Sequence, residues 1–348
     1  MAYTTINKST DYFNTKLWTG TGAENAITGV GFQPDWVWIK NRDASEHHKL
    51  YDAVRGANKV IYSNLTNAEA TVTQDVKSFD SDGFTLGTES AVNASGQDIV
   101  GWNWKAGTGQ GSSNTDGSIN TTYTSVNTTS GFSISQYTGT GVADATVGHG
   151  LGAKVDFLLI KDLGNSSNWI VGHKDTFTTG EIYLNQTNAL SAAFGPFNKT
   201  APTTSVFNLG TDVICNGSGR NYIAYAFATK KGFSKFGKYV GNGNANGTFV
   251  YTGFKPAFVI IKYVSPTSGV GNWNIMDTTR SPSNVVGLAV SANTNNADDG
   301  GVFIDILSNG FKPRSTSSNR NENGSTYIYM AFAEEPLVSS NNIPATAR

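Results

Sequence analysis

One pattern occurs three times along this chain of 348 residues, and that repetition limits the fold more than any other feature of the sequence. Each copy contains a Gly-x-Gly turn two residues after an aromatic side chain. An apolar strand that ends in Ile-Lys follows each turn, and the three Ile-Lys ends align without a gap. The turns occupy residues 18–22, 137–141 and 239–243, and the strands occupy residues 31–40, 150–161 and 253–262. Such a chain is expected to consist of three related units.

Two further anchors follow in every copy. One is a tryptophan with a polar residue four positions later, and the pairs are Trp169 with His173 and Trp273 with Asp277; in copy one Asp52 takes the polar place, with Leu50 or Tyr51 nearby. The other is a closing strand rich in aromatic residues, in which Trp104, Phe227 and Phe332 are equivalent. Each copy therefore spans about 100 residues, the size of one sandwich domain.

The segments between the turns predict strands rather than helices. They are short, rich in Val, Ile, Tyr, Phe and Trp, and bounded by Gly, Asn, Asp or Ser, and no stretch keeps a helical apolar period over three turns. We therefore predict an all-β protein of three tandem β-sandwich repeats, with Ile39, Ile160 and Ile261 at equivalent buried positions. The predicted divisions are an N-terminal arm at 1–16, repeats at 17–107, 131–232 and 233–335, a linker of Gly, Ser, Thr and Asn at 108–130, and a C-terminal tail at 336–348.

Charge and composition exclude several classes of function. The 25 Lys and Arg residues balance 26 Asp and Glu residues, and both signs are scattered, so nothing indicates binding to nucleic acid or to an anionic membrane. No apolar run has the length of a membrane span, and the start lacks the pattern of a signal peptide, so we expect synthesis in the cytosol. The single cysteine, Cys215, cannot form an intrachain disulfide, so stability is expected from packing or assembly.

No arrangement of residues indicates catalysis. Hydrolysis of glycans needs two carboxylates in one cleft, and the candidates are Asp43, Glu46, Asp52, Glu181 and Asp277, none of which recurs as a pair. The sequence also lacks a nucleophile elbow and an activated thiol. We therefore predict no catalytic residue and no cofactor.

The sequence context of the candidate metal ligands favours roles other than metal binding. His47 and His48 are adjacent and would point to opposite faces of a strand. The remaining two histidines, His149 and His173, have no ligand pattern around them. The acidic segments at 80–83 and 298–301 do not continue into full calcium loops and are expected to be turns. We therefore predict no metal site.

Two kinds of residue could contact a ligand. Asp52 with Arg55 and Asp277 with Arg280 share an Asp-x-x-Arg spacing, which could orient a ligand but which we favour as an ion pair within a loop. Among the tryptophans, alternation along strands favours core packing over a platform for sugar rings, and the pairs concerned are Trp36 with Trp38 and Trp102 with Trp104. Trp169 and Trp273 remain as the candidates for contact with a glycan.

Several segments resemble a domain family that recurs in marine bacteriophage proteins described as tail-fibre or structural proteins. They include Trp-Asn-Trp-Lys-Ala-Gly at 102–107, Gly-His-Gly-Leu-Gly at 148–152 and Tyr-Ile-Tyr-Met-Ala-Phe-Ala-Glu at 327–334, with further segments at 113–119 and 131–134. The resemblance extends over the whole chain and implies membership of a virus particle and a lectin-like or jelly-roll sandwich. The repeat pattern by itself leaves an immunoglobulin-like sandwich open, and likeness to lectins does not establish sugar binding.

Together these features predict a bacteriophage virion structural protein, a tail fibre or receptor-binding component that contacts host surface glycans. We expect it to bind other virion proteins through the arm at 1–16, unless that arm is the first strand of the local sandwich. We also expect a homo-oligomer, a trimer if the protein is a fibre. A capsid decoration protein remains an alternative, as do a tail-borne polysaccharide depolymerase, which would need paired acids, and a soluble carbohydrate-binding module.

Overall fold

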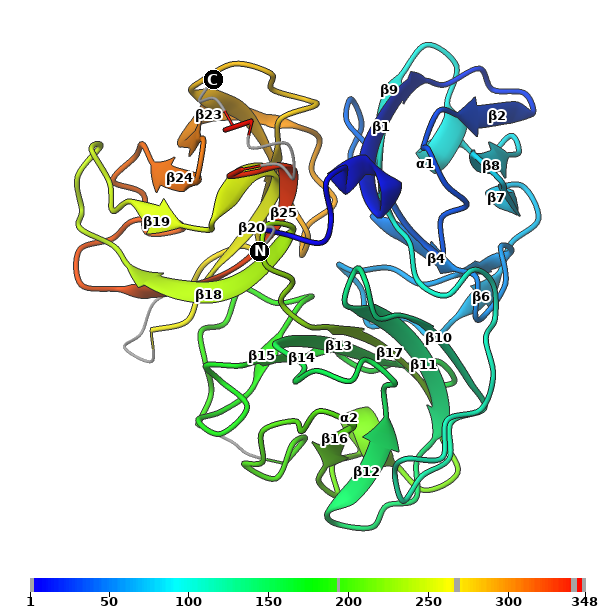
Figure 1. Ribbon diagram of the computed structural model, residues 1–348. Coiled ribbons are helices and arrows are strands. Elements are labelled where there is room, and N and C mark those ends of the chain that lie inside the picture. The colour runs from blue at the N-terminus through cyan, green and yellow to red at the C-terminus, as the bar shows by residue number, and fades with distance from the viewer. Residues whose placement is uncertain (1–2, 193–194, 266–269, 339–342, 346–348) are drawn as a thin grey trace.

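The computed structural model describes residues 3–192, 195–265, 270–338 and 343–345, and strands dominate its regular structure. The two α-helices, α1 (Ser90–Asn93) and α2 (Val213–Asn216), have only four residues each, and η1 (Ser9–Asp11) is a single 3-10 turn. The prediction of an all-β protein is confirmed. Figure 1 shows three lobes around a common centre, coloured blue to cyan, green, and yellow to red in chain order, one for each copy of the sequence pattern.

Each repeat has an inner sheet in which four strands follow the same order. In repeat 1 the order is β1 (Phe13–Thr19), β9 (Asp98–Trp104), β3 (Trp36–Asn41) and β4 (Lys49–Asp52). The corresponding strands of repeat 2 are β11 (Phe132–Thr138), β17 (Asn221–Phe227), β13 (Phe157–Asp162) and β14 (Ile170–His173). Those of repeat 3 are β18 (Ser234–Val240), β25 (Thr326–Pro336), β20 (Phe254–Tyr263) and β21 (Asn274–Asp277).

A second, outer layer of strands covers each inner sheet. It contains β2 (Asn25–Thr28), β8 (Gly83–Leu86) and β7 (Val76–Asp80) in repeat 1, β12 (Ala145–Gly148) and β16 (Val206–Leu209) in repeat 2, and β19 (Val250–Tyr251), β24 (Gly310–Pro313) and β23 (Asp299–Leu307) in repeat 3. Four further strands are β5 (Lys59–Val60), which pairs with β6 (Ala70–Thr71), β15 (Ile182–Tyr183), which extends the inner sheet of repeat 2, and β22 (Val286–Ser291), which joins the two layers of repeat 3. Two layers in each repeat fit the predicted sandwich.

The two middle strands of every inner sheet are buried on both faces, which explains why they are mostly apolar rather than alternately polar. Successive side chains point to opposite faces of a strand. In β13, Phe157 and Leu159 belong to a central cluster shared by the three repeats, whereas Leu158 and Ile160 belong to a cluster within repeat 2. The inner strands of repeats 1 and 3 divide their side chains in the same way between the central cluster and a cluster of their own.

The register of the inner sheets confirms the equivalence of the three isoleucines. Ile39, Ile160 and Ile261 each lie opposite the first residue of the following inner strand, which is Lys49, Ile170 and Asn274 respectively. All three isoleucines are no more than 1% exposed. The predicted core role of the four strand tryptophans is also confirmed, because Trp36, Trp38, Trp102 and Trp104 are all buried in the central cluster.

Aromatic rings from all three repeats meet in the central cluster. The ring of Trp36 lies 4.5 Å from that of Trp104 in repeat 1 and 4.6 Å from that of Tyr225 in repeat 2, measured between centroids. Phe332 of repeat 3 lies 5.0 Å from Phe13 and 5.9 Å from Phe227. The main apolar core therefore lies between the repeats, and a single repeat would expose its share to water.

Each Gly-x-Gly turn is held by a buried asparagine near the end of the same repeat. The carboxamide oxygens of Asn93, Asn216 and Asn321 accept the N–H of the middle residue of the turn at 2.9–3.0 Å, and each amide nitrogen donates to backbone carbonyls. A Cβ on Gly20 would lie 2.1 Å from the carbonyl oxygen of Ala94, so the turn needs glycine there. The repeated glycines are therefore structural.

Two predicted boundaries need correction. Residues 13–16, assigned to the arm, begin β1 and pair with β9. The linker predicted at 108–130 contains β10 (Tyr123–Asn127), which pairs with β11 and so belongs to the sheet of repeat 2. Of the predicted tail at 336–348, residues 339–342 and 346–348 lie outside the described residues, as do residues 1–2 of the arm.

The described part of the arm crosses from repeat 1 to repeat 3 of the same chain (Figure 1). The hydroxyl of Tyr3 donates to the carbonyl oxygen of Gly253 in repeat 3 at 2.6 Å, and that of Thr4 donates to the carbonyl oxygen of Lys231, shortly before β18, at 2.8 Å. Ile6 is 2% exposed and is part of the central cluster. This segment therefore fastens the first repeat to the last.

Candidate functional site

The two tryptophans that the sequence offered as glycan contacts lie between repeats. Trp169 and Trp273 are 0% and 1% exposed. The indole N–H of Trp169 donates to the carbonyl oxygen of Tyr62 in repeat 1 at 2.8 Å, and that of Trp273 donates to Tyr183 in repeat 2 at 2.9 Å. Neither ring has a face open to a sugar, so the structure gives both a packing role.

His48 occupies the corresponding place in repeat 1, directly before β4. Trp38 donates to its Nδ1 at 2.8 Å, so the proton lies on Nε2, which donates to the carbonyl oxygen of Ser291 in repeat 3 at 3.1 Å. Leu50 and Tyr51, which the sequence offered as nearby residues, lie two and three positions further on, in β4. His48 lies four residues before Asp52, the same spacing as in the other two copies, and this spacing was the available signal that His48 corresponds to the tryptophans. The change from tryptophan to histidine obscured it.

These contacts run in one direction around the molecule. Repeat 1 donates to repeat 3, repeat 3 to repeat 2, and repeat 2 to repeat 1. The lysines of two Ile-Lys anchors follow the same direction, since Lys161 donates to Thr66 of repeat 1 and Lys262 donates to Gln186 and Thr187 of repeat 2. The three repeats thus form a closed ring, with each interface built from matching positions.

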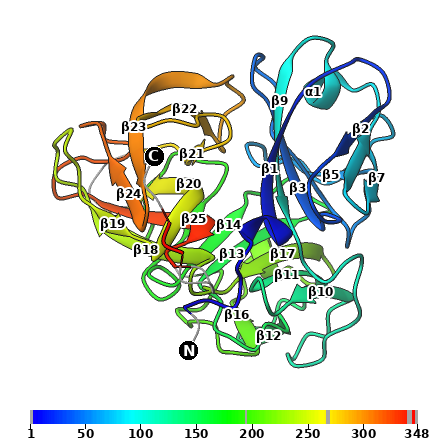
Figure 2. The same cartoon turned by 45° about the horizontal axis from the view of Figure 1, so that its top comes forward.

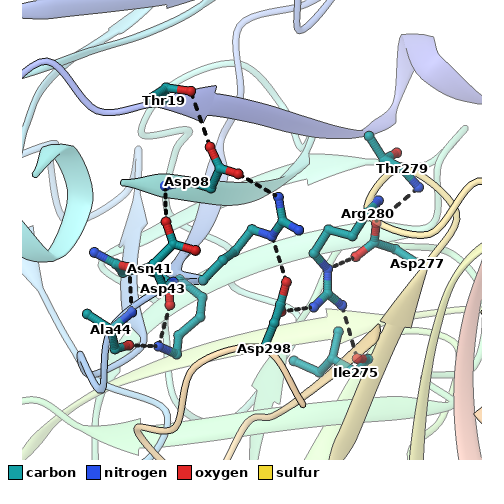
Figure 3. A network of polar contacts seen from close by, with 12 residues as sticks. Thr19, Asn41, Asp43, Ala44, Asp98, Ile275, Asp277, Thr279, Arg280 and Asp298 are labelled. Atoms are coloured by element: carbon teal, nitrogen blue, oxygen red, sulfur yellow. Dashed lines mark hydrogen bonds and ion pairs between the residues drawn. The ribbon is translucent and has the colours of Figure 1, made fainter. Parts of the chain in front are cut away.

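Buried ion pairs reinforce two of the three interfaces. Between repeats 1 and 3, Arg280 lies 2.5 Å from Asp277 and 2.7 Å from Asp298, which in turn lies 2.7 Å from Arg42 (Figure 3). Trp102 of repeat 1 donates to Asp277 at 3.1 Å. The side chains of Asp277 and Arg280 are 0% exposed. The Asp-x-x-Arg spacing therefore forms an ion pair, as predicted.

Asp52 and Arg55 form the equivalent pair between repeats 1 and 2, 2.5 Å apart, and Tyr225 of repeat 2 donates to Asp52 at 2.6 Å. At the third interface the matching residues are Met330 and His173, which are not linked in this way. Nε2 of His173 is buried without a hydrogen-bond partner.

Four of the five acids considered for catalysis, all except Glu46, have partners within the fold. Asp52 and Asp277 bind arginines, Asp43 accepts the backbone N–H of Asp98, and Glu181 accepts the hydroxyl of Tyr183. Of the two acidic turns, Asp82 accepts the backbone N–H groups of Gly29 and Gly31, and Asp298 binds Arg42 and Arg280. Within the described ranges, no group of three His, Cys, Asp or Glu side chains is placed to hold a metal ion.

Cys215 is buried in the cluster of repeat 2, where its thiol donates to the carbonyl oxygen of Pro196 at 3.2 Å. Burial raises the pKa of this thiol well above its usual value. The residue directly precedes the turn-holding Asn216, as Val92 precedes Asn93 in repeat 1. The cysteine is therefore a packing residue and not a nucleophile.

Three of the four histidines are buried in neutral form. Burial lowers the pKa of His48 well below its ordinary value of 6.5, that of His149 to about 4 and that of His173 to about 3. The unfolded chain binds these protons near pH 6.5, whereas the folded chain does not. Stability is therefore highest above pH 6.5 and falls as the pH drops from there toward the folded-state pKa values.

We expect the free energy of unfolding in urea to be clearly lower at about pH 5 than at about pH 7, with each histidine contributing up to about 1.4 kcal/mol per pH unit. His173→Gln should reduce this slope by the share of one histidine, because it removes one group that must remain neutral. Equal unfolding midpoints at the two pH values would show that these rings carry their protons in the folded state.

An open polar hollow with aromatic walls lies at one edge of repeat 3, where it faces repeat 2. Its volume is about 340 Å³, and it lies between the edge strands β18 and β19, which run side by side in Figures 1 and 2. A second hollow of about 220 Å³ adjoins it and shares Lys235 and Tyr251 with it. We name the two together the lysine groove; it is lined chiefly by Tyr3, Lys174, Asp175, Lys231, Lys235, Lys238, Phe249 and Tyr251.

Contacts between neighbours position the groove side chains. The ammonium of Lys235 donates to the carbonyl oxygen of Tyr251 at 2.8 Å and lies 4.9 Å from the centre of its ring. Lys238 forms an ion pair with Asp175 of repeat 2 at 3.1 Å. Partial burial, and then the charge of Lys174, lower the pKa of Lys235. Lys174 and Lys235 therefore lie close enough to repel each other, and Lys235 lies beside the ring of Tyr251.

Comparison with known proteins gives one match. A family model described as a domain of unknown function, DUF7483, matches residues 8–336, which is nearly the whole chain. The chain belongs to this family. No curated protein and no solved structure matches it. The DUF7483 description assigns no activity and no place in a virus particle, so the phage role implied by the resemblance is a proposal. No helix in the described ranges is long and apolar enough to cross a membrane.

Proposed function

We propose that this member of the DUF7483 family is a non-enzymatic structural protein of a bacteriophage particle, placed at its outside as a tail fibre or receptor-binding component that contacts host surface glycans. One observation carries the proposal. The buried charged groups at two of the three repeat interfaces are paired with one another, and the lysine groove is left as a hollow with exposed aromatic and charged side chains. That arrangement suits a rigid particle that binds a polar ligand.

The same observation weighs against a depolymerase. A glycosidase holds two carboxyl groups about 5 to 9.5 Å apart, on either side of a bond in an open cleft. In this chain Asp52 and Asp277 are neutralised by arginines and fully buried. The groove is lined by a single carboxylate, that of Asp175, which pairs with Lys238.

Attachment to the particle needs a surface other than the described part of the arm, because that segment is packed on repeat 3. We propose binding to other virion proteins through the outer face of a repeat, and a homo-oligomer, trimeric if the protein is a fibre, formed along the edge strand β1.

Purified particles produced by the genome that encodes this chain provide the test. Mass spectrometry should find the chain in the particles, and antibody labelling seen by electron microscopy should place it at the tail. An excess of purified protein should lower particle adsorption to host cells by about tenfold or more through competition. Absence of the chain from purified particles, or shortened chains released from host polysaccharide, would overturn the proposal.

A further inference from the structure

We propose that the lysine groove is a binding site for an acidic glycan, a polysaccharide that carries carboxylate or sulfate groups. The inference rests on the proposed function as a particle protein that contacts glycans, and it adds the site and the chemical class of the ligand.

Charge distribution is the first argument. The chain as a whole carries 25 cationic and 26 anionic side chains. The groove, in contrast, is lined by four lysines, Lys174, Lys231, Lys235 and Lys238, and one carboxylate, Asp175. A further carboxylate close by, that of Asp156, is occupied by the backbone N–H of Thr229 at 3.0 Å. Excess positive charge in a hollow favours an anionic ligand.

Aromatic exposure is the second argument. Phe249 is 46% exposed and Tyr251 is 47% exposed, and among the described aromatic residues these two have large exposed surfaces. Both lie at the mouth of the same hollow. Flat aromatic faces next to polar groups suit sugar rings, which have apolar faces and polar edges.

Comparison of the repeats is the third argument, because it separates what the fold needs from what one repeat adds. By strand register, the position of Lys235 holds Asn14 in repeat 1 and Ser133 in repeat 2. The position of Tyr251 likewise holds Thr28 and Gly148. The same architecture thus forms twice without these lysine and tyrosine side chains, so they are not required for folding.

Two alternative roles for these lysines fit less well. Lysine on an edge strand prevents unwanted pairing with other sheets, but this does not account for Lys174 and Lys231, which lie outside the strands, or for the exposed rings. A nucleic acid would need a long track of cations to follow its phosphates. In this chain the four groove lysines lie at one short edge of repeat 3, and the net charge of the whole chain is −1.

The full-length protein should bind at least one of two anionic probes, polygalacturonate, which carries carboxylates, or dextran sulfate, which carries sulfates, and it should not bind neutral dextran. Comparison of the two anionic probes identifies the acidic group. Affinity should fall as salt rises from about 50 to about 500 mM, since screening weakens exposed charge contacts. Absence of binding to both anionic probes, or tighter binding to single-stranded oligothymidylate, would overturn the proposal.

Variants locate the site. Lys235→Gln combined with Lys238→Gln should weaken binding about tenfold or more, and Tyr251→Ala should weaken it at both low and high salt. Lys16→Gln is the matched control, because Lys16 lies on β1, the strand of repeat 1 that corresponds to β18. The thermal unfolding midpoint of each variant shows that it is folded. Equal losses in Lys16→Gln and in the groove variants would refute the assignment of the site.

The outcome also separates this inference from the proposed function. If the groove variants lose the acidic glycan but compete for host cells as well as the unmodified protein does, the particle uses another surface and the groove is not its receptor site. If the groove binds the glycan and the chain is absent from particles, the ligand class stands and the virion role falls.

Discussion

Replacement of Arg280 by methionine is expected to lower the free energy of unfolding by about 3 to 5 kcal/mol. The variant leaves the carboxylate of Asp277 buried at 0% exposure with no cation beside it, and Asp298 retains only Arg42. The penalty is the desolvation of that carboxylate, which the fold no longer offsets. Urea unfolding followed by tryptophan fluorescence measures the change.

Two variants show whether the unpaired charge is the cause. Asp277→Asn combined with Arg280→Met should recover a large part of the loss, since no buried charge then lacks a partner. Lys8→Gln breaks the exposed pair of Lys8 with Asp11 and should change stability by less than about 0.5 kcal/mol. A loss in Arg280→Met no greater than that in Lys8→Gln would mean that water reaches the interface.

Replacement of Trp36 by alanine is expected to cost about 3 to 5 kcal/mol, because it leaves a cavity that the surroundings fill only in part. Trp36 is fully buried and lies against rings of repeats 1 and 2, in a cluster completed by repeat 3. We therefore expect the melting temperature to fall while unfolding remains one transition in calorimetry. Separate transitions for the repeats would contradict a shared core.

Phe249→Ala provides the control for loss of an aromatic ring. This side chain is 46% exposed, so its removal should change the free energy of unfolding by less than about 1 kcal/mol. The difference between the losses of unfolding free energy in Trp36→Ala and Phe249→Ala therefore reports the contribution of the central cluster, and not the general effect of removing an aromatic ring.

The sequence predicted the strands and their equivalence well because the same anchors recur, and each anchor has a physical task in every repeat. Turn glycines contact a buried asparagine, and the middle strands of the inner sheets are mostly apolar because both of their faces are covered. The strand β10 was missed for a physical reason. Its buried residues Thr124 and Ser125 are polar and bond to neighbouring segments, Thr124 to Ser135 of β11 at 3.1 Å and Ser125 to the backbone N–H of Gly107 at 3.0 Å, so no apolar alternation marks the strand in the sequence.

The ring and the groove could not be predicted from the sequence. The pairing of Trp169 with Tyr62, or of Arg42 with Asp298, joins residues that are far apart in the chain and carry no local pattern. Three of the four groove lysines come from residues 231–238, a segment rich in lysine and free of acidic residues, and this was the available signal for a cationic surface. Tyr3, Lys174 and the rings at 249–251 come from other parts of the chain. Only the closed arrangement brings Lys174 and the aromatic rings to these lysines.

Three sandwiches joined in one polypeptide differ from three separate copies in what a mutation can change. In a homotrimer every substitution appears three times, so a cationic hollow at one edge would appear at all three and would add its repulsion three times. Here the position of Lys235 carries asparagine and serine in the other two repeats. A covalent ring can therefore keep two members as scaffold while the third acquires a specialised surface, and each molecule presents that surface once.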